Sequence, residues 1–476
     1  MPGRAVPAST VLLAVDAPAA TRRIYRAGSL AYTAGGLTRV FAALLAGEMV
    51  FTLTDVLEPK LLPVILQHHG ATDTQVGFIV CTITSVMQLL VMPPLGFLSD
   101  RTRSAWGRRL PYLAAATPLT SLFLLLMPFG PQVSAWCGLS VIVSFALLAV
   151  CYRGVQAGSN CMFFGLITDV VPTTHMGRFL ALFRVFGAAG TFVVGYWLIG
   201  GALDRAKAIF AAIAVLNLIG FGALCLTVRE GTYPPTASAP RRSLRTAIAE
   251  FVSQSFGEPV YVWTYIVRTC LYSALALSSF LVFFPQHELG MSLDRYGKLS
   301  SWSSLGWVAL AFPVGLLMDR WGSLRMIWHG VWVIAAAYAA SFLFVVGDVT
   351  FLVSSCVTGL AFWIVMLAQL KLTQEIFHPL RYSQLAGAGT ILQSIGVMVA
   401  GPAAGWMLQA LHGWHSIWQV PWVGSVSVGP YRFVNLLLAA LYGLAWFALL
   451  QVRRHWRRLG GPAAYAAPAL IVSHGK

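Results

Sequence analysis

Three carboxylates lie within one apolar run near the start of the chain, and they are its most unusual chemical feature. Glu48, Asp55 and Glu58 are spaced by seven and then three residues, so in a helix they lie on one face. A charge at the centre of an apolar layer costs about 2.5–3.5 kcal/mol on insertion scales, so such groups mark sites of function. Crowded carboxylates also favour protonation. We expect these carboxylates, Asp55 above all, to exchange a proton or to contact a ligand.

A second interpretation of the same run stays open. If the helix began later, Glu58 and Lys60 would form a solvated pair at its mouth. In a later run, Arg153 lies about midway, where an arginine without a partner is strongly disfavoured. Gln156 and Asn160 lie one and two turns beyond it and could bind a hydroxylated ligand.

Two further runs carry charged groups whose role, functional or structural, the sequence leaves open. Arg268 lies eight or nine residues into its run, and functional and structural roles are equally plausible there. Lys371 and Glu375 are four residues apart and could neutralise each other on one helix face.

Composition decides what surrounds these charges. The 476 residues are 58% hydrophobic and only 10% charged, with a mean hydropathy of +0.73. Soluble domains carry about 25% charged residues, so most of this chain must face lipid. A cytosolic enzyme, a disordered protein and a disulfide scaffold are excluded. The seven cysteines all fall in apolar runs without ligand spacing, so we expect no metal site and no cofactor.

Twelve apolar runs are long enough to cross a bilayer, and they must be helices because every backbone amide needs an internal partner there. They cover residues 40–66, 76–98, 111–129, 135–168, 178–201, 206–228, 260–285, 297–318, 325–346, 350–377, 384–411 and 431–452. The sequence therefore predicts an all-α integral membrane protein with two six-helix bundles. The expected units are a tail (1–39), a bundle (40–228), a linker (229–258), a second bundle (259–455) and a tail (456–476). Within the linker, residues 243–256 predict an amphipathic surface helix, with a solvated loop as the alternative.

The net charge of +16 reflects topology rather than nucleic-acid binding, because no basic stretch combines interleaved aromatics with a soluble frame. Lys and Arg concentrate in the tails and in alternate loops, which predicts that both termini lie in the cytoplasm. We expect a monomeric, multi-pass protein of the plasma (inner) membrane whose partners are lipid and a small solute.

A short motif recurs in the two predicted bundles. Gly96-Phe-Leu-Ser-Asp100-Arg101 follows the second run, and Gly315-Leu-Leu-Met-Asp319-Arg320 follows the eighth. Such a recurrence is typical of transporters built from parallel repeats.

The first copy continues through Gly107-Arg108-Arg109 and resembles the loop motif between the second and third helices of the major facilitator superfamily. Its extended form resembles the glycoside and sucrose cation symporters. The segment Arg153-Gly-Val-Gln156 is similar to the superfamily's fourth-helix motif, with Ala157 where glycine is usual.

This resemblance implies a transporter with alternating access. It implies a gate formed by the motif residues Gly96, Asp100, Arg101, Gly107, Arg108, Arg109, Asp319 and Arg320. It also makes Arg153 a partner for Asp55 or Glu58, since the first and fourth helices line the central cavity of the superfamily.

The chain lacks a phosphate-binding Gly-x-x-x-x-Gly-Lys-Ser/Thr motif, so ATP is not expected to drive transport. We expect proton-coupled symport of a sugar or glycoside, with Na⁺ as the alternative coupling ion. Proton-driven efflux of drugs or metabolites and a non-transporting assembly factor are the alternatives. A sugar site needs an aromatic platform and amides. Candidates in the second bundle are Tyr265, Tyr272, Trp302, Trp307, Trp363, Gln369 and Gln393.

Overall fold

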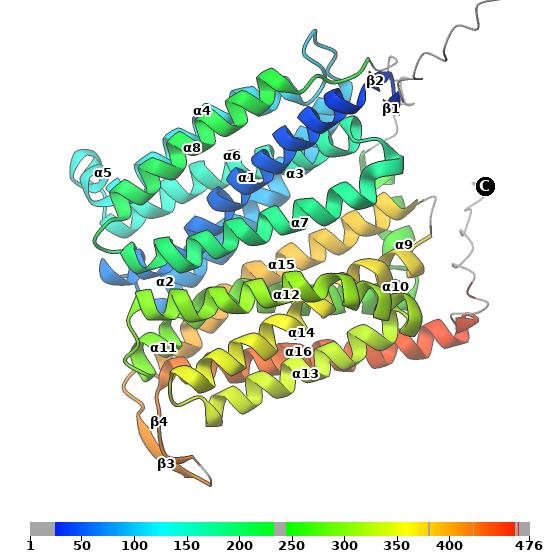
Figure 1. The fold of residues 1–476 in the computed structure, drawn as a ribbon. Coiled ribbons are helices and arrows are strands. Elements are labelled where there is room, and N and C mark those ends of the chain that lie inside the picture. Colours follow the sequence, from blue (N-terminus) through cyan, green and yellow to red (C-terminus); the bar gives the residue numbers. More distant parts are fainter. Residues whose placement is uncertain (1–23, 233–243, 379–380, 422, 462–464, 466–476) are drawn as a thin grey trace, which may run out of the picture.

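The structure is a computed structural model that describes residues 24–232, 244–378, 381–421, 423–461 and 465. Within these ranges it does not describe the side chains of residues 173, 244–248, 303–305, 307–312, 315, 319 and 383. Nearly all of the described chain is helical, and the long helices run roughly along one common direction (Figure 1).

The first half of the chain forms six membrane-length segments. Their helices are α1 (Ala34–His68), α2 (Asp73–Gly77), α3 (Thr84–Arg101), α4 (Leu110–Leu126), α5 (Gly130–Cys137), α6 (Val141–Val170), α7 (Met176–Val193) and α8 (Ala206–Thr227). Short turns of π- or 3₁₀-helix extend or join them, namely η1 (Phe78–Ile83), η2 (Met127–Phe129), η3 (Thr173–His175), η4 (Val194–Leu198) and η5 (Ile199–Gly201).

The second half repeats this plan after α9 (Leu244–Phe256). Its helices are α10 (Pro259–Leu277), α11 (Phe283–Glu288), α12 (Leu293–Trp321), α13 (Ser323–Phe344), α14 (Asp348–Ile376), α15 (Tyr382–Ala410) and α16 (Phe433–Arg458), with the 3₁₀ turns η6 (Ser278–Val282) and η8 (Pro430–Arg432). Eleven segments of the described chain are long and apolar enough to cross a membrane, and α12, with 29 residues, is the remaining long helix. The all-α membrane fold with two six-helix bundles is confirmed.

Local structure departs from the sequence expectation at several places. Helix α1 begins at Ala34, where Thr33 caps it by accepting a hydrogen bond from Gly36 N. Residues 130–137 form α5, which prolongs the third segment instead of opening the fourth. Of the two interpretations of residues 243–256, the structure shows a helix over Leu244–Phe256, and Ser243 lies outside the described residues.

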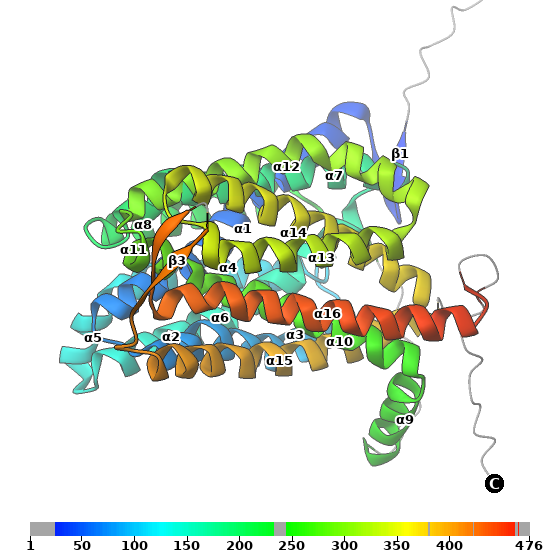
Figure 2. The same cartoon turned by 90° about the horizontal axis from the view of Figure 1, so that it is seen from below.

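Two antiparallel hairpins, which the sequence analysis did not predict, mark opposite ends of the bundle. The hairpin of β1 (Tyr25–Ala27) and β2 (Leu30–Tyr32) lies at the same end of the bundle as α9 and the end of α16, and we call this end the terminal side. The hairpin of β3 (Ser416–Val420) and β4 (Gly424–Val428) lies at the other end, the hairpin side. Figure 2 shows the same separation of the two ends from below.

Glycines let the two halves approach closely at the hairpin side. A Cβ atom on Gly77, just before η1, would collide with the carbonyl of Gly401 on α15. At a second crossing, a Cβ on Gly297 of α12 would collide with the carbonyl of Gly195 in η4. Backbone contact of this kind is how membrane helices pack tightly without a hydrophobic driving force. Both crossings coincide with π-helical turns, which occur often at functional sites.

Candidate functional site

The two carboxylates Asp55 and Glu58 meet Arg153 between α1 and α6. One guanidinium nitrogen of Arg153 donates to Glu58, and the other donates to Asp55 Oδ1 at 3.4 Å. Glu58 is fully buried and Arg153 nearly so, whereas 41% of the Asp55 side chain is exposed. Glu58 is therefore buried in the helix and does not belong to a solvated pair at its mouth.

Neighbouring polar contacts hold α1 and α6 in register. The Tyr152 hydroxyl donates to the Thr54 carbonyl at 2.7 Å, and Gln156 Nε2 donates to Thr54 Oγ1 at 3.5 Å. Pro59, one residue after Glu58, has no N–H to bond the Asp55 carbonyl, so a backbone acceptor is freed beside the ion pair. Asn160 lies one turn beyond Gln156 on α6 and is half-buried.

The charged cluster is incompletely satisfied. Within the described residues, Glu58 Oε1 and Arg153 Nε are buried without a hydrogen-bond partner. Cys81 of η1 is close enough for the charges of Glu58 and Arg153 to act on its thiol. That thiol donates to the Ala276 carbonyl of α10 at 3.8 Å, so the cluster lies next to the contact between the two halves.

Glu48 is separate from this cluster, although the sequence places it on the same helix face. It is 5% exposed, accepts a hydrogen bond from Thr52 Oγ1 at 3.3 Å and faces Gly187 of α7. Its second oxygen is buried without a partner in the described part of the chain. The charge of the exposed Arg184 on α7 acts on it.

Arg268 lies on α10 and reaches toward α15. Its terminal nitrogens approach the Ala386 carbonyl at 3.4 Å, Thr390 Oγ1 at 3.4 Å and Gln393 Oε1 at 3.3 Å. The buried Nε has no partner within the described residues. In contrast to Arg153, Arg268 thus contacts only neutral acceptors among the residues that the structure describes.

A cavity of about 220 Å³ lies inside the second half, between α10, α12, α13, α14 and α16. Its lining includes hydroxyl and amide groups together with aromatic rings. The main polar contributors are Tyr296, Tyr338, Ser354, Thr358, Asn435 and Tyr442. Of the aromatic and amide candidates whose side chains the structure describes, none lines it. The sequence gives no signal of which interior face of its helix each of these residues occupies.

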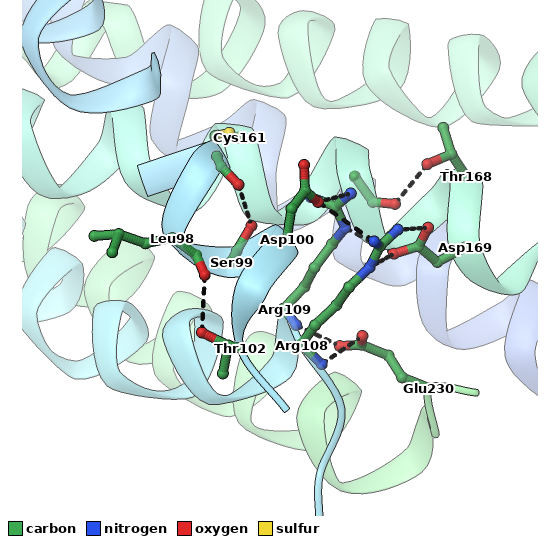
Figure 3. Close-up of polar contacts among 12 residues, drawn as sticks. Leu98, Ser99, Asp100, Thr102, Arg108, Arg109, Cys161, Thr168, Asp169 and Glu230 are labelled. Carbon is green, nitrogen blue, oxygen red and sulfur yellow. Dashed lines mark hydrogen bonds and ion pairs between the residues drawn. The ribbon is translucent and has the colours of Figure 1, made fainter. Parts of the chain in front are cut away.

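The loop between α3 and α4 forms a network of charges at the terminal side (Figure 3). Arg108 and Arg109 both bind Asp169 at the end of α6, with closest distances of 2.7 Å. The exposed Asp100 lies 3.4 and 3.3 Å from the same two arginines. All these contacts stay within the first half.

Glu230, which follows α8, completes this network although sequence reasoning did not select it. Its carboxylate accepts hydrogen bonds from the backbone N–H groups of Arg108, Arg109 and Leu110 at 2.6–2.9 Å. It thereby caps the start of α4. Gly107 adopts φ of +111°, which brings the backbone against Glu230 where a Cβ would collide.

The remaining motif residues have simpler surroundings. Gly96 faces Cys161 of α6, and the guanidinium of Arg101 lies 3.6 Å from the ring centre of Phe97. In the second copy, Arg320 is exposed, and the side chain of Asp319 lies outside the described part. Glu375 accepts a hydrogen bond from Ser323.

The family follows from these features and from comparison with known proteins. Residues 43–400 match the model of the Major Facilitator Superfamily, and the chain belongs to this family. It is a multi-pass membrane transporter and not an enzyme.

Solved structures share this fold at low sequence identity. A bacterial homologue of the human lysosomal transporter Spinster, in an inward-facing conformation, is 15% identical with a TM-score of 0.69, over 92% of this chain and 100% of that one. A D-xylose-proton symporter is 14% identical with a TM-score of 0.63, over 87% and 97% of the two chains.

One curated relative is an uncharacterized symporter from Synechocystis sp., 26% identical over 228 residues. The matched region covers 45% of this chain and 40% of that relative.

Proposed function

We propose that the protein is a proton-coupled symporter that moves a small hydroxylated solute, a sugar or glycoside, across the plasma (inner) membrane as a monomer. The arrangement of Arg153 between a fully buried Glu58 and a half-exposed Asp55 carries this proposal. Such a cluster can accept a proton at the exposed carboxylate while the buried pair keeps the helices together.

The orientation follows from the positive-inside rule. The loop between α3 and α4, the end of α16 and the chain termini are rich in Arg, so the terminal side faces the cytoplasm. With this orientation, the contacts between the halves close the external side in this conformation.

Coupling arises because the cluster lies next to that closure. A proton on Asp55 removes one of the two negative charges that hold Arg153, and the ion pair then rests on Glu58 alone. Binding of the solute and of the proton each favour the same occluded state, so each raises the affinity for the other. Rocking of one half against the other then exposes the site to the opposite side.

The hydroxyl-lined cavity supports the choice of solute. Tyr338 and Tyr442 stack with ring centres 5.9 Å apart, and hydroxyls of Ser354 and Thr358 lie in the same lining. Aromatic faces with a few polar groups suit a sugar ring. The similarity to a D-xylose-proton symporter is consistent with this class.

Accumulation of radiolabelled monosaccharides, sugar acids and glycosides in proteoliposomes, driven by an imposed pH gradient, tests the proposal. We expect uphill accumulation that a protonophore abolishes. Asp55→Asn, whose side chain cannot be ionised, should abolish uphill accumulation but still allow the solute to move down its own concentration gradient. Accumulation that persists in Asp55→Asn, or that follows a Na⁺ gradient alone, contradicts proton coupling through Asp55.

The same vesicles distinguish the alternatives. Extrusion of amphipathic dyes against a proton gradient, without sugar uptake, would indicate efflux. Movement of neither class of compound would indicate a non-transporting assembly factor.

A further inference from the structure

Arg268 differs from Arg153 in lacking a countercharge. Among the described residues, no carboxylate forms an ion pair with it, and its buried Nε has no acceptor. An arginine at membrane depth is expected to pair with an acidic group, because isolated charge is costly there. The missing anion can therefore come from the solute.

Helix geometry indicates that Thr390 and Gln393, two partners of Arg268, face the space between the two halves. Successive residues of a helix turn by about 100°. On α15, Gly396 packs against α10, and Gly401 packs against η1 of the first half. Viewed down the axis of α15, Thr390 and Gln393 lie between the side that contacts α10 and the side that contacts η1. Ile395 lies on the opposite side of the helix and is exposed, as a lipid-facing residue would be.

The groups around Arg268 form a suitable site for a carboxylate. Its present contacts, at 3.3–3.4 Å, are longer than the usual N–H···O distance of about 2.9–3.0 Å. A guanidinium binds a carboxylate through two parallel, charge-assisted hydrogen bonds, which are about twice as strong as neutral ones. The Thr390 hydroxyl now donates to the Ala386 carbonyl at 3.0 Å, and it can turn to the same anion together with the Gln393 amide nitrogen.

The cavity begins farther along the same face of α10. Leu275, which lines it, is seven residues from Arg268, so the two lie on one face about 10 Å apart. An elongated solute can thus hold an acidic group at Arg268 and extend its body toward the cavity.

We propose that the solute is a hydroxylated organic anion whose carboxylate binds Arg268 with Thr390 and Gln393. This inference rests on the proposed function and specifies its substrate class. It has a consequence for energetics: one proton moving with one monovalent anion carries no net charge. Uptake should then follow the pH gradient and be insensitive to membrane potential.

Matched pairs of compounds that differ only in charge test the inference. We would measure binding of gluconate against sorbitol, and of glucuronate against glucose, to the purified full-length protein by calorimetry. The carboxylate member of at least one pair should bind at least 10-fold more tightly. Arg268→Gln should weaken that binding on the order of 10- to 100-fold, as expected for a charged hydrogen-bond pair.

Two controls keep a folding defect separate from a lost contact. Arg268→Lys keeps the charge without the planar fork and should recover part of the affinity. Arg39→Gln removes an equal charge from an exposed position of α1 and should leave binding unchanged. Equal binding of acid and neutral members, no binding by any acid, or unchanged preference in Arg268→Gln would overturn the inference.

The two proposals fail in different ways. Proton-driven accumulation of a neutral sugar would retain the symporter and remove the anion site. Arg268-dependent binding of an acid, without accumulation in a pH gradient, would retain the anion site and remove the symporter.

Discussion

The two ends of the bundle use polar networks in opposite ways. At the hairpin side, hydrogen bonds cross between the halves; at the terminal side, the charged network of Figure 3 stays within the first half. Among the described residues, every hydrogen bond that joins the two halves lies toward the hairpin side. One network therefore seals the halves together, and the other braces a single half.

The hairpin-side network is centred on Asp73 and Tyr431. The Tyr431 hydroxyl donates to Asp73 at 3.1 Å and accepts from Gln67, whose nitrogen lies 2.5 Å away. His287 stacks on the Tyr431 ring with centres 4.7 Å apart and contacts Gln67 at 3.2 Å, while His412 lies 4.0 Å from Asp73. Asp73 and Tyr431 are both 5% exposed, so breaking this network leaves buried polar groups unpaired.

This difference indicates how a transporter whose halves rock against each other can hold one end closed without stiffening the whole molecule. In the proposed transport cycle, contacts that cross the halves must break, whereas Arg108, Arg109, Asp169 and Glu230 can stay paired and move as one body. The loop motif then serves in this conformation as a brace of the first half.

Preventing the backbone contact between Gly77 and Gly401 should have the largest effect on closure of the hairpin side. Gly77→Leu places a side chain against the Gly401 backbone, and overpacking costs about 1–3 kcal/mol or more. In a variant with Cys81 as its only cysteine, maleimide labelling of this buried thiol should rise on the order of 10- to 100-fold. Gly222→Leu on α8, where a Cβ meets nothing within 4 Å, is the matched control. Unchanged labelling would show that the contact does not hold the end closed.

A smaller effect is expected from one hydroxyl group of the seal. Tyr431→Phe removes the hydroxyl that Asp73 and Gln67 share and leaves Asp73 with the longer hydrogen bond from Gln67 at 3.4 Å. Loss of a hydrogen bond to a buried polar group costs about 1–3 kcal/mol. Labelling of Cys81 should rise by about 10-fold. Tyr112→Phe removes a hydroxyl that contacts Thr102 at 2.7 Å at the terminal side and should leave labelling unchanged. Equal responses of the two variants would erase the distinction between the ends.

The smallest effect is expected from the brace. Glu230→Gln keeps the shape but weakens the cap of α4, and lost caps cost about 1 kcal/mol. Thermal unfolding in detergent should begin a few degrees lower, with Cys81 labelling unchanged. Glu258→Gln is the matched control, because Glu258 precedes α10 without capping it through its side chain. Increased labelling in Glu230→Gln would mean that the loop network contributes to the seal.

The partners of each charge could be predicted only in part. Pairing of Arg153 with Asp55 or Glu58 was expected from the family resemblance, and the structure shows both contacts. The pairing of Arg108 and Arg109 with Asp169 was not predicted. Asp73 and Tyr431 were overlooked because each stands at the edge of an apolar run, where a polar residue is ordinary.

The membrane environment, the twelve helices and the repeated halves could be predicted from the sequence alone. These follow from local properties, namely the length of apolar runs and the need of every backbone amide for a partner in lipid. Three features required the three-dimensional structure: which end is closed, why Glu48 faces α7 while Glu58 meets Arg153, and that Arg268 contacts no acidic group in the described chain. The physical reason is that these choices depend on the rotation and lateral packing of each helix, which residues far apart in the chain set together.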